Sequence, residues 1–182
     1  MSNAYEELKP FLERAQAFST ARILFEWDNE TLAPRAAEPN TTKVVGTLSG
    51  EYFSVITDEK VKELVRRCRQ EKESLGEVES AVVRELAEEI ERLECIPPEE
   101  YREFAELTAG STGIWARAKE NNDFESFAPV LKKIVEYSRK FASYRAKEGQ
   151  RLYDVMLSDY EKGFDIETLD RFFGTLKERL VP

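Results

Sequence analysis

The sequence predicts an all-α, multi-helix fold, with residues 1–182 forming a single domain. Apolar residues recur at spacings of three and four along most of the chain, which is typical of amphipathic helices, and no segment alternates like a strand. Helix breakers are scarce, with 8 glycines and 7 prolines in 182 residues. Charged residues make up 35% of the chain, so each helix has a solvated face opposite its apolar one.

The first predicted helix covers residues 4–26 and runs into Trp27. Its apolar stripe consists of Leu8, Phe11, Leu12, Ala15, Phe18 and Ile23. Pro34 and Pro39 then remove amide donors and disfavour helix at the residue before each, so we expect a connector over residues 28–40.

The second and third helices follow this connector. Asn40, Thr41 or Thr42 is expected to cap the second helix, because each side-chain oxygen can accept a first-turn amide. Thr57 and Asp58 are expected to begin the third. The buried faces of the two helices are predicted to hold Val44, Val45, Leu48 and Tyr52, and Val61, Leu64, Val65 and Cys68.

Gly76 separates the third helix from the fourth, and the fourth helix is expected to stop before Pro97. The fifth begins at Pro98 with acidic residues in its first turn, which suits the positive end of the helix dipole, and it ends near residues 121–122. The predicted buried stripes are Val78, Val82, Leu86, Ile90 and Leu93, and Phe104, Leu107, Thr108, Ser111 and Trp115.

Asp123 is expected to cap the sixth helix. Pro129 predicts either a kink or a later start near residue 126. Its inward positions are predicted to be Phe124, Phe127, Leu131, Ile134, Ser138 and Phe141. A short segment over 152–160 and a last helix over 166–180 complete the pattern.

The last helix ends at Val181-Pro182 without a glycine or asparagine cap, while Leu176 and Leu180 still form an apolar face. We therefore expect the domain to continue in a longer protein. Helices meant to pack on a missing part would expose more than a few hundred Å² of apolar surface, and we expect the chain to self-associate through it.

Charge and cysteine content narrow the possible partners and compartment. The net charge is −9 and no basic stripe occurs, which argues against nucleic acid as a partner. Apolar runs fall far short of the ~20 residues of a membrane span, and no leader pattern is present, so we expect a cytoplasmic protein without a membrane partner. Cys68 and Cys95 lie in helical patterns and are predicted to be reduced, buried thiols.

The chain contains no histidine, which forces any catalysis onto carboxylates, Lys, Tyr, Cys or Ser. The acidic groups Glu88-Glu89-Glu91 and Glu99-Glu100-Glu103 are interpreted as solvated faces, because Arg84, Arg92 and Arg102 lie among them. Residues 159–167 suggest a calcium loop, but Asp170 stands where the twelfth-position glutamate belongs. We expect Asp165 to cap the last helix instead.

Residues 110–113, Gly-Ser-Thr-Gly, complete neither a phosphate loop nor a nucleophile elbow. The two glycines are interpreted as marking either a close helix approach or a local break in the fifth helix. Trp27 and Trp115 are predicted to be core anchors. No catalytic, cofactor-binding or metal-ligating residue is predicted in this chain.

Three segments together resemble the N-terminal part of the Taq-type, or thermostable, metallocarboxypeptidase family. Residues 24–34 resemble that family's Trp-Asp-x-x-Thr-x-x-Pro segment. Residues 115–119, continued by 123–131, form the second segment, and residues 152–163, leading to Leu169-Asp170, form the third. Their order and separation match the family across nearly the whole chain.

The resemblance implies a helical homodimer that uses zinc or another divalent metal to release single residues from peptide C-termini in a deep groove. The family's metal site is a His-Glu-x-x-His helix and a downstream glutamate, none of which is present here. This sequence also departs from the family at Ala33, where many relatives have methionine, and at Tyr52-Phe53, where histidine is common.

These observations leave three hypotheses. The first is that the chain is the N-terminal helical domain of such an enzyme, forms a wall or lid of its peptide groove, and is inactive without the missing catalytic domain. The second is a stand-alone helical binding or scaffolding module descended from the peptidase. The third is a split enzyme whose catalytic chain is separately encoded.

Overall fold

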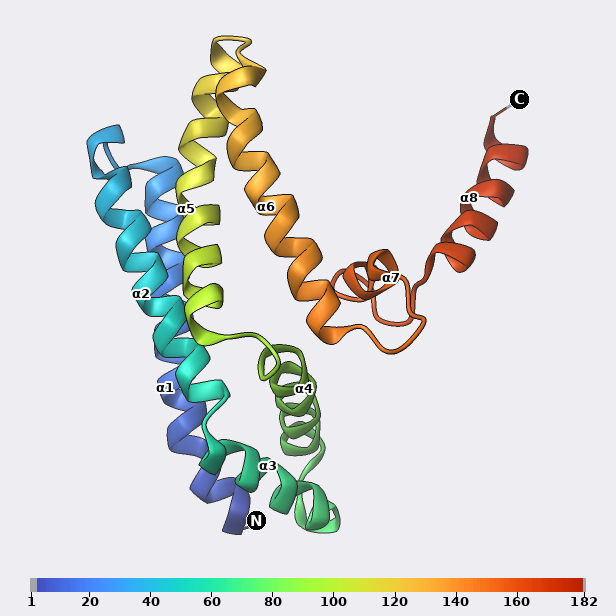
Figure 1. Ribbon diagram of the computed structural model, residues 1–182. Helices are drawn as coiled ribbons and strands as arrows, with labels where there is room; N and C mark the ends of the chain where they lie inside the picture. The colour runs from blue at the N-terminus through green and yellow to red at the C-terminus, as the bar shows by residue number, and fades with distance from the viewer. Residues whose placement is uncertain (1–2, 182) are drawn as a thin grey trace. The chain divides into compact units, whose positions relative to one another are not determined.

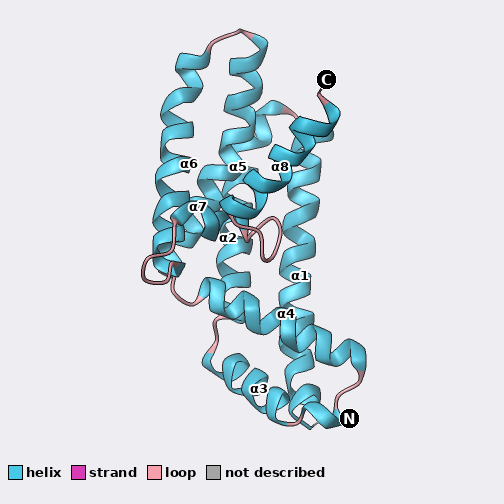
Figure 2. Ribbon diagram, turned by 90° about the vertical axis from the view of Figure 1, so that its right-hand side faces the viewer, coloured by secondary structure: helices cyan, strands magenta, loops and turns pink. Residues whose placement is uncertain are grey.

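The computed structural model describes residues 3–181, and this part of the chain is helical without a strand (Figures 1 and 2). The prediction of an all-α, multi-helix fold is confirmed. The α-helices of the described part are α1 (Asn3–Thr31), α2 (Glu38–Ile56), α3 (Glu59–Gln70), α4 (Glu77–Leu93), α5 (Pro98–Glu120), α6 (Phe124–Arg145), α7 (Leu152–Leu157) and α8 (Ile166–Leu180), with short 3-10 turns at Arg35–Ala37 and Lys72–Ser74.

The chain forms two compact units, an N-terminal unit of residues 1–134 and a C-terminal unit of residues 135–182, and α6 contributes residues to both. In the N-terminal unit α2 packs mainly against α1 and α5, while α3 packs against α1 and α4. None of the helices within residues 3–181 combines the length and the apolar character needed to cross a bilayer.

The core of the N-terminal unit lies where the start of α1 meets α3, α4 and the end of α2. Leu8, Val61, Leu64 and Cys68 are its most completely buried large side chains. The third helix therefore forms as predicted, with Asp58 accepting a hydrogen bond of 2.7 Å from the Lys60 amide. Its buried positions follow the 3.6-residue period, so one face enters the core and the other carries charge.

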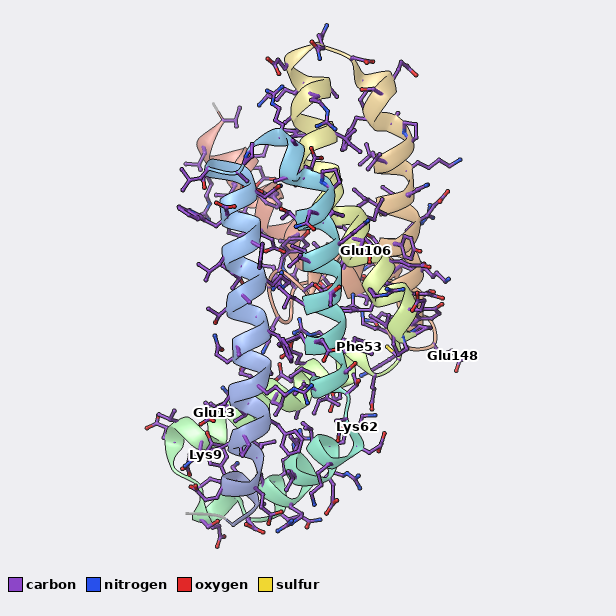
Figure 3. The ribbon with its side chains drawn as sticks, turned by 90° about the vertical axis from the view of Figure 1, so that its left-hand side faces the viewer. Lys9, Glu13, Phe53, Lys62, Glu106 and Glu148 are labelled. Carbon is purple, nitrogen blue, oxygen red and sulfur yellow. The ribbon has the colours of Figure 1, made fainter. Side chains whose placement is uncertain are left out.

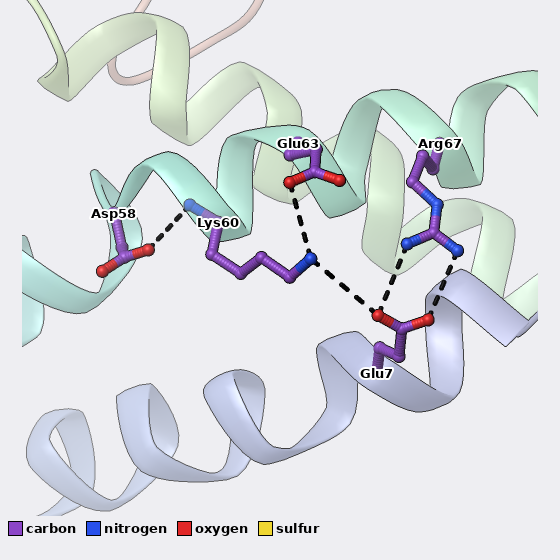
Figure 4. A network of polar contacts seen from close by, with 5 residues as sticks. All are labelled: Glu7, Asp58, Lys60, Glu63 and Arg67. Atoms are coloured by element: carbon purple, nitrogen blue, oxygen red, sulfur yellow. Dashed lines mark hydrogen bonds and ion pairs between the residues drawn. The ribbon is translucent and has the colours of Figure 1, made fainter.

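Ion pairs cover the outer edge of this core. Glu7 of α1 accepts hydrogen bonds from both terminal nitrogens of Arg67 at 3.3 and 3.4 Å, and its carboxylate lies 4.0 Å from the Lys60 ammonium (Figure 4). Lys60 also contacts Glu63 at 3.4 Å. These partly exposed pairs fix how α1 lies on α3, although each contributes at most about 1 kcal/mol to stability.

Glycines allow α2 and α5 to approach closely in antiparallel register. A Cβ built on Gly46 would collide with the side chain of Glu106, and one on Gly113 would collide with the carboxylate of Glu38. Further along, Phe53 packs on Tyr101 with 4.8 Å between ring centroids (Figure 3 marks Phe53 and Glu106). Because α5 is unbroken from residue 98 to 120, the glycines at 110–113 mark a close helix approach and not a break.

Polar contacts join the segments of the C-terminal unit, beside the ring contacts of Phe141 with Tyr137 and Tyr144. Arg145 donates two hydrogen bonds to the Asp159 carboxylate, at 2.6 and 2.7 Å. Asp154 accepts from the Ile166 amide at 3.0 Å and from Arg151 at 2.8 Å. Asp165 caps α8 as predicted, accepting from the Thr168 amide at 2.8 Å.

The predicted connector over residues 28–40 is wrong in extent. Helix α1 continues to Thr31 and α2 already begins at Glu38. Pro39 lies in the first turn of α2, where its missing N–H would have had no helical partner, so it starts the helix instead of delaying it. Thr41, expected among the caps, is consequently a buried residue inside α2.

Several side chains predicted to be buried are exposed. Trp27 and Trp115 are 56% and 47% exposed, so neither is a core anchor, and Cys95 is exposed while Cys68 is buried. Helix α4 buries Val83, Leu86, Ala87 and Ile90, whereas Val78 is 75% exposed. The predicted stripe on α4 is therefore correct at Leu86 and Ile90 and wrong at Val78.

The sixth helix begins at Phe124, before the alternative start near residue 126. Asp123 caps it as predicted, accepting from the Ser126 amide at 3.2 Å. Pro129 lies within this helix. Phe141 is buried as expected, but Phe124 is 64% exposed, so the prediction that Phe124 faces inward is wrong.

Candidate functional site

Two of the family-like segments meet at one place in the N-terminal unit. The end of α1 and the middle of α5 line a pocket of about 400 Å³, and α2 closes it with Glu38. The lining residues are Asn29, Glu30, Thr31, Ala33, Pro34, Arg35, Glu38, Thr112, Gly113, Trp115, Ala116 and Arg117. Segments about 80 residues apart in the sequence thus form one surface.

The local backbone explains this arrangement. Helix α1 ends where the Asp28 carbonyl accepts both the Leu32 and Ala33 amides, at 2.9 and 2.8 Å. Pro34 then adopts an extended conformation that turns the chain toward α2. Because Gly113 has no side chain, the Glu38 carboxylate fits directly against α5.

Paired charges set the electrostatics of the pocket. Glu38 is only 17% exposed at its side chain and accepts a hydrogen bond of 2.9 Å from Arg117. Arg35 contacts Glu120 at 3.4 Å. The Glu38–Arg117 pair neutralises itself, while Glu30 and Arg35 add further charged groups to the lining.

Trp115 is shared with a second pocket of about 290 Å³ that the start of α6 completes through Phe124 and Phe127. The Lys119 ammonium lies 4.9 Å from the centre of the Trp115 ring, a cation–π distance. An exposed tryptophan between two hollows provides a flat apolar surface with polar groups at its edges.

The described residues do not fit a catalytic metal. Between residues 3 and 181, no three Cys, Asp or Glu side chains come together in a way that could hold a metal ion, and the sequence has no histidine. Burial raises the pKa of the Cys68 thiol, which disfavours the thiolate that a metal would bind.

A second polar cluster lies apart from these pockets, where α2 faces α4. The Tyr52 hydroxyl donates a hydrogen bond of 2.6 Å to Glu89. Burial is the main cause that raises the pKa of Tyr52 well above its usual value, and this hydrogen bond is the second cause. Burial also raises the pKa of Tyr101. Both phenols therefore stay protonated at neutral pH, and the Tyr52 hydroxyl acts as a donor.

The sequence-based interpretations of polar residues hold in part. The Arg102–Glu99 pair is an exposed ion pair, as expected for a solvated face, whereas Glu89 is partly buried against Tyr52. Within residues 110–113, Thr112 and Gly113 line the larger pocket. Sequence reasoning missed Glu38, and the signal that could have found it is Gly113, whose role becomes clear only with α2 beside it.

The all-α fold, with two of the three family-like segments meeting beside Trp115, agrees with the class of helical proteins that the sequence resembles. The family model described as carboxypeptidase Taq (M32) metallopeptidase matches residues 7–182. The chain belongs to this family.

Individual relatives agree with this assignment. Carboxypeptidase 1 of Bacillus subtilis is 30% identical over 181 residues, which are 99% of this chain and 36% of the relative. Thermostable carboxypeptidase 1 of Pyrococcus furiosus is 30% identical over 169 residues, 93% of this chain and 34% of the relative. This chain thus spans about a third of the length of the curated relatives it matches.

Solved structures give the same result. The crystal structure named BsuCP superposes with a TM-score of 0.94 at 29% identity, covering 100% of this chain and 36% of that one. Pyrococcus furiosus carboxypeptidase superposes at 0.75 with 26% identity, covering 99% of this chain and 36% of that one. Trypanosoma cruzi metallocarboxypeptidase 1, at 24% identity, covers 97% of this chain and 36% of that one, and shares the fold with a TM-score of 0.76.

Proposed function

We propose that this chain is the N-terminal helical domain of a metal-dependent carboxypeptidase, in which it forms one wall or lid of the peptide groove and does not hydrolyse peptides by itself. The observation that carries the proposal is the TM-score of 0.94 over the whole chain against 36% of the BsuCP structure. Residues 1–182 act as one functional part in this proposal.

The absence of histidine in the sequence supports the proposal that this chain binds the peptide while another part of the enzyme holds the metal. A His-Glu-x-x-His helix uses two imidazoles one turn apart to hold the metal and the glutamate between them as the base for metal-bound water. This chain supplies none of those imidazoles, so the zinc or other divalent metal of the whole enzyme lies in its other part. The contribution of this chain is to bind and orient the peptide.

Trp115 and the Glu38–Arg117 pair are the proposed peptide-facing groups. The half-exposed indole offers an apolar contact, and the neighbouring polar side chains and exposed backbone offer hydrogen bonds to an extended substrate. In the same proposal the enzyme is cytoplasmic and homodimeric, and the exposed apolar residues of α8, Phe172, Phe173 and Leu180, support self-association.

The first test is to assay the chain alone with zinc or cobalt and a peptide with a free C-terminus. We expect no release of the terminal residue, because the chain has no metal-binding helix. Metal-dependent release that disappears with a chelator would refute the proposal.

The second test is complementation. The chain is mixed with the portion of the Bacillus subtilis enzyme that lacks the matching 36%, and peptidase activity is measured. We expect activity to be restored, and Trp115→Ala to raise KM with little change in kcat. Tyr160→Ala, which removes an aromatic side chain that is 88% exposed, is the matched control and should leave KM unchanged.

A further inference from the structure

A small polar hollow lies among α1, α2 and α5, next to the pocket that holds Trp115. Its volume is about 180 Å³, and α1 and α5 both pack on α2 around it (Figures 1 and 3). The hollow is smaller than the roughly 300–1,000 Å³ of small-molecule sites, so it has room for the head group of one side chain and not for a helix. Its lining consists of Glu26, Asn29, Glu30, Thr41, Val45, Thr108, Ala109 and Thr112.

Several hydrogen-bonding groups of this hollow have no protein partner within residues 3–181. Thr41 is only 8% exposed, and none of the described residues forms a hydrogen bond with its hydroxyl. The same holds for the side-chain amide of Asn29, the carboxylate of Glu30 and the hydroxyl of Thr112. Because a buried hydroxyl normally has a hydrogen-bond partner, Thr41 and the three groups beside it form a set that a bound molecule can satisfy.

The hollow is negatively charged even when carboxylates that already have a partner are left out. Glu26 accepts a hydrogen bond of 2.9 Å from Arg22, so its charge is matched. The other charged residues of the neighbouring pocket are paired with each other or with Glu120, as described above. Glu30 remains, and no lysine or arginine lines the hollow within the described part of the chain. One negative charge is therefore available to a cation.

The backbone of α1 adds to this negative potential. Asn29 and Glu30 lie in the last turn of α1, where the helix macrodipole has its negative end and where a cation is favoured. That turn contains no basic residue. Glu30 thus departs from the local preference of a helix end, and such departures are expected at functional sites.

The acceptors of the hollow fit a primary ammonium group. Such a group has three N–H donors and no acceptor, and each of the three helices offers an oxygen, from Glu30 on α1, Thr41 on α2 and Thr112 on α5. A neutral head group would leave the charge of Glu30 unpaired, and an anion would be repelled by it. A charge-assisted hydrogen bond to Glu30 is the strongest contact that the hollow can make.

We propose that this hollow binds the ammonium group of a lysine side chain in the peptide substrate. The inference rests on the proposed function, because Asn29, Glu30 and Thr112 also line the Trp115 pocket, from which the peptide reaches the hollow. The chain thereby makes the enzyme favour peptides that contain lysine, while the metal-holding part performs the cleavage.

The first experiment measures binding of short peptides to the chain alone. A fluorophore blocks the N-terminus of each peptide, and the central residue is lysine, acetyl-lysine or norleucine, so that only the first peptide has an ammonium group. Fluorescence anisotropy should show about tenfold tighter binding of the lysine peptide, because only its hydrogen bonds are charge-assisted. Equal binding of the three peptides would overturn the proposal.

Matched variants locate the ammonium group. Glu30→Gln keeps the size of the side chain but removes its charge, so it should weaken the lysine peptide about tenfold and leave the norleucine peptide unchanged. Glu73→Gln, at an exposed residue outside the hollow, is its control. Thr41→Val should weaken the lysine peptide severalfold, whereas Thr47→Val, at an exposed position of the same helix, should not.

Helical circular dichroism confirms that each variant folds. An equal loss of binding in each variant and its control would contradict the proposal, because it would place the peptide on the general negative surface.

The second experiment separates this site from the proposed function. The chain is combined with the remaining portion of the Bacillus subtilis enzyme, and lysine is placed in turn at each position of the peptide. At one or more positions lysine should give a higher kcat/KM than norleucine, and Glu30→Gln should remove the difference.

The outcomes of this experiment are distinct. Activity without a preference for lysine would refute the site and leave the proposed function intact. Absence of activity, together with Glu30-dependent binding of the lysine peptide, would support the site and contradict the proposed function. If Glu30→Gln instead weakens the association of the two portions and leaves the lysine preference unchanged, a side chain of the other portion occupies the hollow and the proposal is wrong.

Discussion

Helices α3 and α8 are both amphipathic, but they differ in how far their apolar faces are buried. Helix α3 buries Val61, Leu64, Val65 and Cys68 in the core of the N-terminal unit. Helix α8 has an equally regular stripe, but no residue of it is buried, and Phe172 and Phe173 are 52% and 58% exposed. An apolar stripe therefore predicts that a helix has a side to bury, and only its neighbours decide whether that side is buried.

The N-terminal and C-terminal units also differ in how much apolar surface they bury. The core of the N-terminal unit is a continuous cluster of apolar side chains. In the C-terminal unit Phe141, Ala142 and Val155 are the buried apolar residues among those described. Phe141 contacts the rings of Tyr137 and Tyr144, and ion pairs and helix caps make up many of the other contacts. The first unit should therefore respond most to lost volume, and the second to lost charge.

The largest expected effect is that of Leu64→Ala in α3. Leu64 is 0% exposed, so its truncation leaves a cavity and should lower the free energy of unfolding by about 3 kcal/mol. Phe172→Ala in α8 should change it by less than about 0.5 kcal/mol. Urea denaturation followed by circular dichroism measures both, and similar losses for the two variants would contradict the comparison.

A smaller loss is expected from Tyr52→Phe, which removes the hydrogen bond to Glu89. The free energy of unfolding should fall by about 1–2 kcal/mol near neutral pH. Since the pKa of Tyr52 is raised by folding, its contribution is fully present below about pH 10, the value in an unfolded chain, and decreases as the pH rises above it. The wild-type chain should therefore lose more stability than the variant between about pH 9 and pH 11, and parallel losses would contradict this cause.

In the C-terminal unit Arg145→Lys should cost about 1 kcal/mol, because lysine keeps the charge but cannot make both hydrogen bonds to Asp159. Hydrogen exchange measured by mass spectrometry should show faster exchange around α7, with α3 unchanged as the internal control. Equal acceleration in α3 would indicate that the two units do not respond separately.

The smallest effect is an acid shift confined to the C-terminal unit. The hydrogen bond from the Ile166 amide is the main cause that lowers the pKa of Asp154, and the hydrogen bond from Arg151 is the second. The hydrogen bonds with Thr168 lower the pKa of Asp165. Their stabilisation is present above about pH 4, the value in an unfolded chain, and is lost as the pH falls below it. The protection factors of amides at the start of α8, which correct exchange rates for the intrinsic effect of pH, should fall on acidification, and should fall less in Asp154→Asn, whose side chain does not titrate. If protection at the start of α8 depends on pH in the same way in the wild-type chain and in Asp154→Asn, then Asp154 is not the cause of the acid shift.

Much of the fold could be predicted from local chemistry. Asp58, Asp123 and Asp165 cap the helices they were expected to cap, because a cap needs only a side-chain oxygen and an amide two or three residues away. The predicted start of α5 at Pro98 and its end near residues 121–122 are also confirmed. The start has no side-chain cap and instead has proline in the first turn, where its missing N–H leaves no helical bond unmade.

The candidate site could not be predicted in this way. Glu38 and Gly113 are 75 positions apart, and neither is unusual in its own segment. Trp115 has the spacing of a core residue, but it lies on a part of α5 that the described helices leave half-exposed. Such positions depend on contacts between distant segments, which periodicity does not report.

The sequence by itself determined that the chain is helical, where most helices begin and end, and that it has no histidine with which to hold a metal as its family does. The tertiary structure decided which of the two apolar faces of α4 is buried, that Pro39 starts a helix, and that Trp27 and Trp115 face outward. The physical reason is that helix formation and capping depend on neighbours a few residues away, whereas burial depends on which distant helix covers a given face.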